Sequence, residues 1–161
     1  MNTIYLSLGS NIEPRKKYLE EAIKLINNKL GRVNIVSSIY SSAAWGFESQ
    51  PFLNLCLQIF TTYNTKDVLK QTQEIESLIG RSEKEGTSYE AREIDIDIIY
   101  SSEGVFRYPE LNVPHLLMQF RKFVLVPLAE IAPNYTHPLL HQTTLKLLIE
   151  CNDNGDLIKL E

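Results

Sequence analysis

A run of alternating residues at positions 92–100 constrains the fold of this chain more than any other stretch. Asp95 and Asp97 alternate there with three isoleucines. Because side chains of a β-strand point alternately to opposite faces, the pattern predicts a strand with one apolar and one acidic face. At a rise of about 3.3 Å per residue, the two carboxylates lie about 6–7 Å apart at Cβ. Both can then reach one cation, or each can hold one of two cations about 3.5–4 Å apart.

A half-buried strand with a solvated outer face is the plain alternative for this pattern. Aspartate is depleted in strands, and an ordinary outer face more naturally carries Thr, Lys or Gln. Arg92 also stands three residues before Asp95, where a negatively charged ligand requires a cation. The stretch therefore favours a divalent-metal site that binds phosphate.

The composition is that of one globular domain, which we expect to span residues 1–161. Hydrophobic residues make up 43% of the 161 residues and charged residues 22%, an ordinary globular balance. The net charge of −4 argues against broad nucleic-acid binding, which requires a basic field. No apolar run approaches the ~18 residues of a membrane span, and no signal peptide is visible. Cys56 and Cys151 are far apart and suit free thiols in a reducing compartment. We expect a cytoplasmic protein with no membrane or nucleic-acid partner.

Hydrophobic periodicity predicts an α+β fold. Strands are expected at 4–8, 33–40, 52–63, 92–100 and 105–108, and helices at 14–30, 66–78, 124–131 and 143–151. The first strand is expected to stop at Gly9-Ser10-Asn11, with Asn11 as N-cap of the first helix, and Thr65 is expected to cap the second. The order β-α-β, β-α-β is the ferredoxin-like pattern, a mainly antiparallel sheet with helices packed on one side.

Two long irregular segments, 41–51 and 81–91, have the character of functional loops. Trp45 lies in the first, where it either plugs the core or contacts a flat ligand. Asn54 follows that loop and either caps it or presents its amide to a heterocycle. The second loop leads directly into the aspartate strand and could fold over a ligand held there.

Six short stretches follow one another along the chain: 6–11 (Leu-Ser-Leu-Gly-Ser-Asn), 50–54 (Gln-Pro-Phe-Leu-Asn), 73–76 with Gly80-Arg81, 92–98, 113–115 (Val-Pro-His) and 121–128. In this order and spacing, from about residue 4 to residue 133, they resemble the 6-hydroxymethyl-7,8-dihydropterin pyrophosphokinases of folate biosynthesis. The resemblance implies that the terminal diphosphate of ATP, the co-substrate, is transferred to the hydroxymethyl group of the dihydropterin, with release of AMP.

The resemblance also implies a role for individual residues. Asp95 and Asp97 would hold two Mg²⁺ ions, which prefer oxygen ligands, and the catalytic residues would be Arg81, Arg92, Asp95 and Asp97. The expected ATP contacts are Gln73, Glu76, Arg81, Arg92, Ile98, His115 and Arg121. The expected pterin contacts are Ser42, Ala43, Ala44, Trp45, Phe52, Asn54, Tyr89 and Phe123, with the two phenylalanines stacked on the ring.

Three of these residues also have a purely structural explanation. Phe52 and Phe123 suit packing in the core, and His115 suits a turn after proline. The chain also departs from the family at two places. Residues 88–92 read Ser-Tyr-Glu-Ala-Arg where many members have Arg-Trp-Gly-Pro-Arg, so that Tyr89 would replace the aromatic residue of the lid. Leu116 follows His115 where a tyrosine is common.

Two other functions compete with the pyrophosphokinase. One is a non-catalytic ferredoxin-like module that binds a small molecule or RNA. The other is a metal-dependent phosphohydrolase that uses the same aspartates. We expect a monomer whose partners are its small-molecule substrates, ATP and the dihydropterin.

Overall fold

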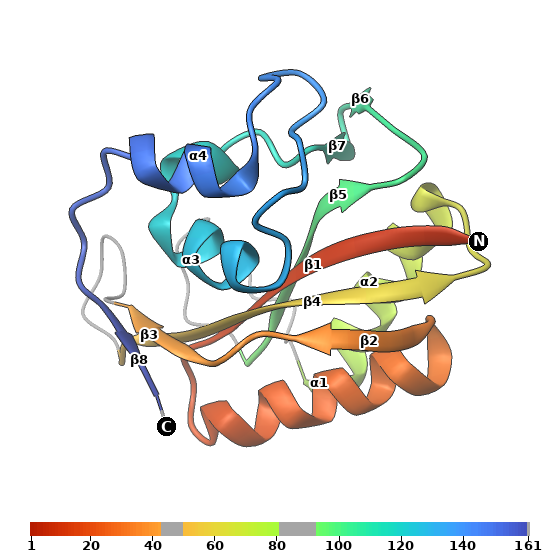
Figure 1. Cartoon of the computed structure of the whole chain (residues 1–161). Helices are drawn as coiled ribbons and strands as arrows, with labels where there is room; N and C mark the ends of the chain where they lie inside the picture. The colour runs from red at the N-terminus through yellow and green to blue at the C-terminus, as the bar shows by residue number, and fades with distance from the viewer. Residues whose placement is uncertain (43–49, 81–92, 161) are drawn as a thin grey trace.

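The computed structural model describes residues 1–42, 50–80 and 93–160. Its centre is an antiparallel sheet with the strand order β5-β1-β4-β3-β8. The middle strand, β1 (Asn2–Ser10), pairs with β4 (Phe52–Thr61) on one side and with β5 (Asp95–Ser101) on the other. The predicted antiparallel sheet is confirmed (Figure 1).

Three shorter strands extend the sheet beyond β4. Both β2 (Arg32–Val36) and β3 (Tyr40–Ser42) pair with β4, and β8 (Leu157–Lys159) pairs with β3 at the edge. The strand predicted at 33–40 is therefore broken in two. At the break, Ser37 exchanges hydrogen bonds with the backbone of Cys56. A separate hairpin joins β6 (Phe106–Tyr108) to β7 (Leu111–Val113).

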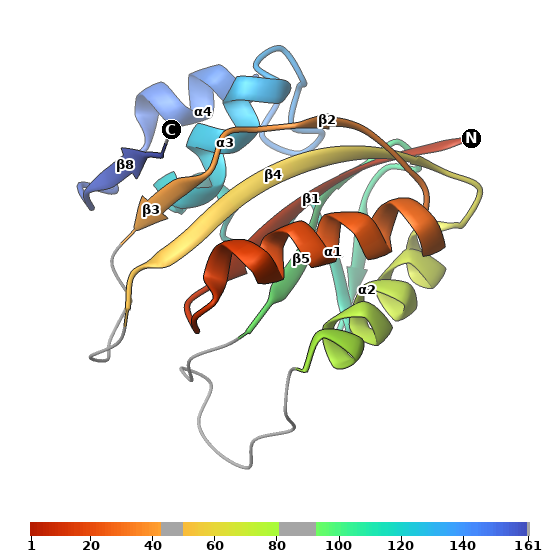
Figure 2. The same ribbon diagram turned by 90° about the horizontal axis from the view of Figure 1, so that it is seen from below.

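Helices cover both faces of the sheet, which corrects the expectation that they pack on one side. Figure 2 shows α1 (Arg15–Lys29) and α2 (Thr65–Ile79) on one face, with α3 (Lys122–Ile131) and α4 (Thr144–Glu150) on the other. The spacing of apolar residues in 124–131 predicts a helix. The hydrophobic pattern of the strands does not indicate which face of the sheet that helix covers. We call these two sides the α1/α2 face and the α3 face. Among the described residues, no helix is long and apolar enough to cross a membrane.

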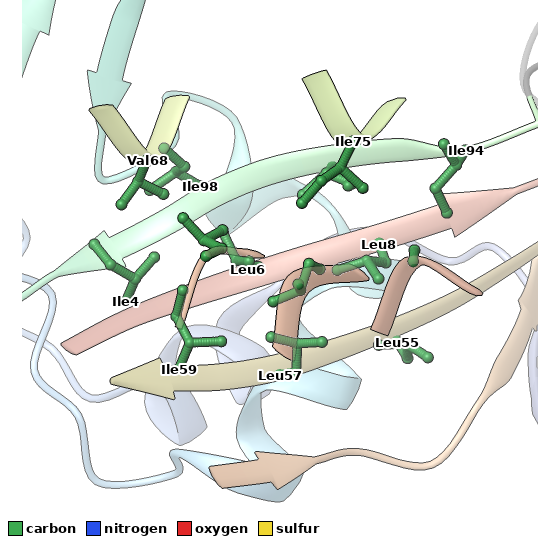
Figure 3. Close-up of a cluster of buried hydrophobic side chains, with 14 of the residues drawn as sticks. Ile4, Leu6, Leu8, Leu55, Leu57, Ile59, Val68, Ile75, Ile94 and Ile98 are labelled. Atoms are coloured by element: carbon green, nitrogen blue, oxygen red, sulfur yellow. The ribbon is translucent and has the colours of Figure 1, made fainter. Parts of the chain in front are cut away.

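The larger core lies under the α1/α2 face. It combines alternate residues of the strands with the buried stripes of the two helices (Figure 3). Its labelled members are Ile4, Leu6, Leu8, Leu55, Leu57, Ile59, Val68, Ile75, Ile94 and Ile98. Leu6 and Ile75 are fully buried. This core accounts for the apolar side of the alternating pattern.

The smaller core lies on the α3 face. Tyr5 and Tyr100 pack edge to face with their ring centroids 6.0 Å apart, and Tyr135 stacks on Tyr100 at 4.2 Å. Leu125 and Leu128 of α3 are fully buried in the same cluster. This cluster occupies the end of the α3 face where β1 begins, and it leaves the polar residues at the other end of β1 outside it.

Three predicted boundaries are wrong. Strand β1 continues through Gly9 and Ser10, because both residues pair with β4. Helix α1 begins at Arg15, so Asn11 is not its N-cap; Pro14 holds that position without a side-chain cap. The cap of α2 is Asn64, whose side chain accepts a hydrogen bond from the backbone N–H of Asp67 at 2.9 Å, whereas Thr65 is the first helical residue.

Candidate active site

A row of four residues crosses the sheet on the α3 face. Gly9 of β1 pairs with Asp95 of β5 on one side and with Asn54 of β4 on the other. Asn54 in turn pairs with Tyr40 of β3. Adjacent strands lie about 4.8 Å apart, so the Cα atoms of Asp95 and Asn54 are separated by about 10 Å. The row therefore places a carboxylate and an amide on either side of a glycine.

The two aspartates share this face, as the alternating pattern predicts. Asp97 pairs with Ser7, which lies two residues before Gly9. Both aspartates are half-buried, and Ile96 between them is buried toward the other face. Among the described residues, no group of three or more His, Cys, Asp or Glu side chains gathers as a metal site. Two carboxylates fit Mg²⁺, which keeps few protein ligands and completes its coordination with phosphates and water.

Gly9 approaches its neighbours closely. A Cβ atom built on Gly9 would lie 3.1 Å from Oδ1 of Asn54 and 3.6 Å from Cδ1 of the Phe52 ring. The first distance is tighter than an ordinary contact, so a side chain at this position would push on Asn54. A glycine inside a strand commonly marks a close approach of this kind. The glycine is visible in the sequence, but Gly-Ser-Asn locally favours a turn and so conceals its place inside a strand.

Asn54 is buried, and its orientation is fixed from β3. Its Nδ2 donates to Oγ of Ser42 at 2.7 Å, and Ser42 pairs with Phe52. Asn54, Phe52 and Ser42 are three of the predicted pterin residues, and the structure brings them together at the ends of β3 and β4. Nδ2 also lies 3.5 Å from the carbonyl of Phe52, so both donors of the amide face the ends of β3 and β4 and its acceptor, Oδ1, lies on the side of Gly9.

Glu76 supports the aspartate strand from behind. This buried side chain of α2 accepts a hydrogen bond from the backbone N–H of Ile96 at 3.0 Å. Among the described strands, β5 is at the edge of the sheet, so Glu76 satisfies an N–H that no described strand reaches. The peptide that it holds lies between Asp95 and Asp97. Gln73, the other expected ATP contact on α2, lies three residues before Glu76. Its side chain is exposed and lines a groove with Lys29 and Lys70.

His115 and Arg121 lie near the end of β5. The backbone N–H of His115 donates to the carbonyl of Ile99 at 3.2 Å, which holds His115 beside the strand. Burial lowers the pKa of His115, the charge of Arg121 acts in the same direction, and the charge of Asp95 opposes them. The guanidinium of Arg121 lies 5.7 Å from the centre of the Phe123 ring. His115 is thus close enough to Arg121 and Asp95 for their charges to act on it, and Arg121 lies beside Phe123.

Tyr40, the last residue of the row, links the sheet to α3 by a hydrogen bond. Its hydroxyl donates to Glu130 at 2.6 Å, and the same carboxylate accepts from the backbone N–H of Ser38 at 2.6 Å. Burial, together with the bond to Glu130, raises the pKa of Tyr40 to about 12. The sequence carried no short-range signal for this contact, because its partners are 90 residues apart.

The remaining predicted residues fall into two groups. Ile98 is buried in the core of the α1/α2 face, so its side chain points away from the aspartates and only its backbone could meet a nucleotide. The other predicted residues lie outside the described part of the chain; these are Ala43, Ala44, Trp45, Arg81, Tyr89 and Arg92.

Comparisons with known proteins identify the family of the chain. The family model of 7,8-dihydro-6-hydroxymethylpterin-pyrophosphokinase (HPPK) matches residues 5–133. A 2-amino-4-hydroxy-6-hydroxymethyldihydropteridine pyrophosphokinase of Aquifex aeolicus is 40% identical over 140 residues, which are 86% of each chain. The protein of that name from Bacillus subtilis is 39% identical over 132 residues, 81% of this chain and 78% of the relative.

The fold recurs in larger proteins. A crystal structure of Plasmodium falciparum HPPK-DHPS superposes with a TM-score of 0.77 at 17% identity, over 92% of this chain and 45% of that one. The chain thus spans less than half of that protein, and the likeness shows the fold alone. The family model matches most of the chain, and the named relatives are 33–40% identical to it over most of its length. The chain therefore belongs to the 7,8-dihydro-6-hydroxymethylpterin-pyrophosphokinase family.

Proposed function

We propose that the row Asp95–Gly9–Asn54 is where this enzyme transfers the diphosphate of ATP to 6-hydroxymethyl-7,8-dihydropterin. Family membership makes the chain a pyrophosphokinase of folate biosynthesis, with ATP as co-substrate. The observation that carries the assignment to this row is the register. It sets the carboxylate of Asp95 and the amide of Asn54 on opposite sides of a residue without a side chain.

The division of the row into two halves supports the proposed roles. On the β4 side, the amide of Asn54 would read the polar edge of the pterin, and Phe52 and Phe123 would stack on its ring. On the β5 side, Asp95 and Asp97 would hold two Mg²⁺ ions. When bound, these ions neutralise phosphate charge and make the substrate hydroxyl easier to deprotonate.

The protein's own contribution is positioning and charge. Diphosphoryl transfer gives the protein little covalent chemistry to perform, so holding the hydroxymethyl oxygen in line with the β-phosphorus supplies most of the rate. The hydroxymethyl group would lie above Gly9, between the ring held by Asn54 and the phosphates held at Asp95. His115 and Arg121 would contact the phosphates from the end of β5. Gln73 and Ile98 keep their proposed place on the nucleotide side, Ile98 through its backbone, and Glu76 would act there through the Ile96 peptide that it holds.

Residues outside the described part complete the proposal. Arg81 and Arg92 would bind the phosphates as catalytic residues, and Ala43, Ala44, Trp45 and Tyr89 would enclose the pterin. We propose one domain, 1–161, acting as a cytoplasmic monomer. The two free cysteines fit a reducing compartment, and sedimentation of the pure protein tests the oligomeric state.

The deciding experiment follows AMP release by the pure protein with MgATP, with and without the dihydropterin. We expect AMP and the pterin diphosphate in equal amounts, and no AMP without the acceptor. AMP formed without the pterin would instead identify a phosphohydrolase. Binding without turnover would identify a non-catalytic module.

A further inference from the structure

The first turn of α1 carries charges of the wrong sign for its own stability. Arg15, Lys16 and Lys17 open the helix, no acidic residue lies in its first turn, and Pro14 supplies no side-chain cap. The N-terminus of a helix bears a partial positive charge, so cations there are unfavourable. Helix energetics therefore do not explain Arg15, and its contacts must be sought outside α1.

Arg15 contacts the start of β4. Its Nη1 donates to the backbone carbonyl of Pro51 at 2.7 Å, across 36 residues of sequence. Its Nε donates at 2.7 Å to Glu13, whose second oxygen accepts from the Arg15 backbone N–H at 3.2 Å. Glu13 thus fixes the plane of the guanidinium so that one arm points at Pro51. The Arg15 side chain is only 22% exposed, whereas Lys16 is exposed.

The position of Pro51 affects the proposed pterin site directly. It directly precedes Phe52, the first residue of β4, whose ring reaches the space above Gly9. On one side, Phe52 is held by its pairing with Ser42. The bond from Arg15 holds the preceding peptide from the α1 side, and Figure 1 shows that the start of α1 and the start of β4 lie at the same end of the sheet.

We propose that Arg15 is a positioning residue for the pterin half of the site. It fixes the Pro51 carbonyl, and through it the backbone of Phe52, without contacting either substrate. Because this rests on the proposed function, the effect should fall on the pterin and not on ATP, whose proposed contacts lie on β5, α2 and the segment before α3.

The test measures two dissociation constants and one melting temperature for Arg15→Ala, with Mg²⁺ present throughout. The pterin is titrated with the protein saturated by α,β-methylene-ATP, and the ATP analogue is titrated separately. We expect pterin binding to weaken about five- to tenfold, less than a directly lost charge-assisted hydrogen bond would cause, because Arg15 acts on the pterin only through the Pro51 backbone. The affinity for the analogue should stay within about twofold. The melting temperature should stay the same or rise, because an unfavourable charge leaves the helix N-terminus.

Two further variants separate position from charge. Arg15→Lys keeps a donor but loses the fork held by Glu13, so it should restore part of the pterin affinity. Lys16→Ala removes the neighbouring exposed cation from the same turn, so it should leave both affinities unchanged, while its melting temperature stays the same or rises as a lost charge alone predicts. Unchanged pterin binding in Arg15→Ala would overturn the proposal. So would a fall in both affinities together with the melting temperature, since that pattern marks a merely structural residue. A wild-type protein that releases no AMP with both substrates would instead reject the proposed function.

Discussion

Replacing Gly9 by alanine tests whether the enzyme needs the empty position between Asp95 and Asn54. The new methyl would lie 3.1 Å from Oδ1 of Asn54 and 3.6 Å from the Phe52 ring. Only the first distance is too short, so Asn54 must move by a few tenths of an ångström. That shift disturbs an amide held by a 2.7 Å hydrogen bond to Ser42.

The size of the effect follows from these contacts. One weakened hydrogen bond removes about 0.5–1.5 kcal/mol, and packing an extra methyl into a filled space costs about 1–3 kcal/mol. Part of the packing strain is relieved when Asn54 moves, so we take about 1–2 kcal/mol as the loss in pterin binding. At 1.4 kcal/mol per factor of ten, the KM for the pterin should rise about 5- to 30-fold.

Steady-state AMP release, with each substrate varied at saturation of the other, measures both KM values. The KM for ATP should change less than about twofold, because the methyl points toward Asn54 and Phe52. Thr3→Ala is the matched control: it alters the same strand on the same face, six residues away, and should leave both values unchanged. An unaltered pterin KM in a folded Gly9→Ala enzyme would refute the role of this space.

Three further outcomes are expected. Asp97→Ala should abolish AMP release while the far-ultraviolet circular dichroism stays native; an active, folded variant would contradict the metal assignment. Glu76→Ala should lower both turnover and the free energy of unfolding, the latter by about 1–3 kcal/mol, because the buried N–H of Ile96 loses its acceptor. Glu76→Gln keeps an acceptor there and should recover most of that stability; equal losses in the two variants would argue against the anchor. Burial lowers the pKa of His137 below its ordinary 6.5, and Arg107 and His141 add to this. The unfolded chain then binds the proton first, so stability should fall as the pH drops through 6.5 toward the lower folded pKa. His137→Asn, which can still accept from the N–H groups of Leu139 and Leu140, should flatten that fall in melting temperature between pH 7.5 and 5.5.

Local pattern was enough for some parts of the site and not for others. The alternation of Asp95 and Asp97 with isoleucines predicts both the strand and the shared face, because side-chain direction in a strand depends on parity alone. The same rule sets Asn54 on the polar side of β4. Parity does not identify which residues of other strands lie next to each other. Gly9 lies between Asp95 and Asn54 only because β1 pairs with both β4 and β5.

Two of the three misplaced boundaries have a common cause. Gly9 and Ser10 favour a turn locally, but strands on both sides of β1 supply backbone partners and extend it. Asn64 and Thr65 are both good N-cap residues, and the structure uses the first because Thr65 is engaged elsewhere. Its hydroxyl lies 2.6 Å from Glu103, near the far end of β5. Tertiary contacts decided each case.

The two-sided sheet has a consequence for how this sequence can vary over time. Along β1, even-numbered residues such as Leu8 fill the core below α1 and α2, and Gly9 faces the ligand side. An insertion or deletion of one residue within β1 would exchange these assignments beyond that point, because a strand's parity reverses with each added residue. It would drive a leucine into the place of the substrate and leave a hole beneath the helices. A substitution in β1 disturbs one position on one face, whereas a change in its length disturbs both faces at once.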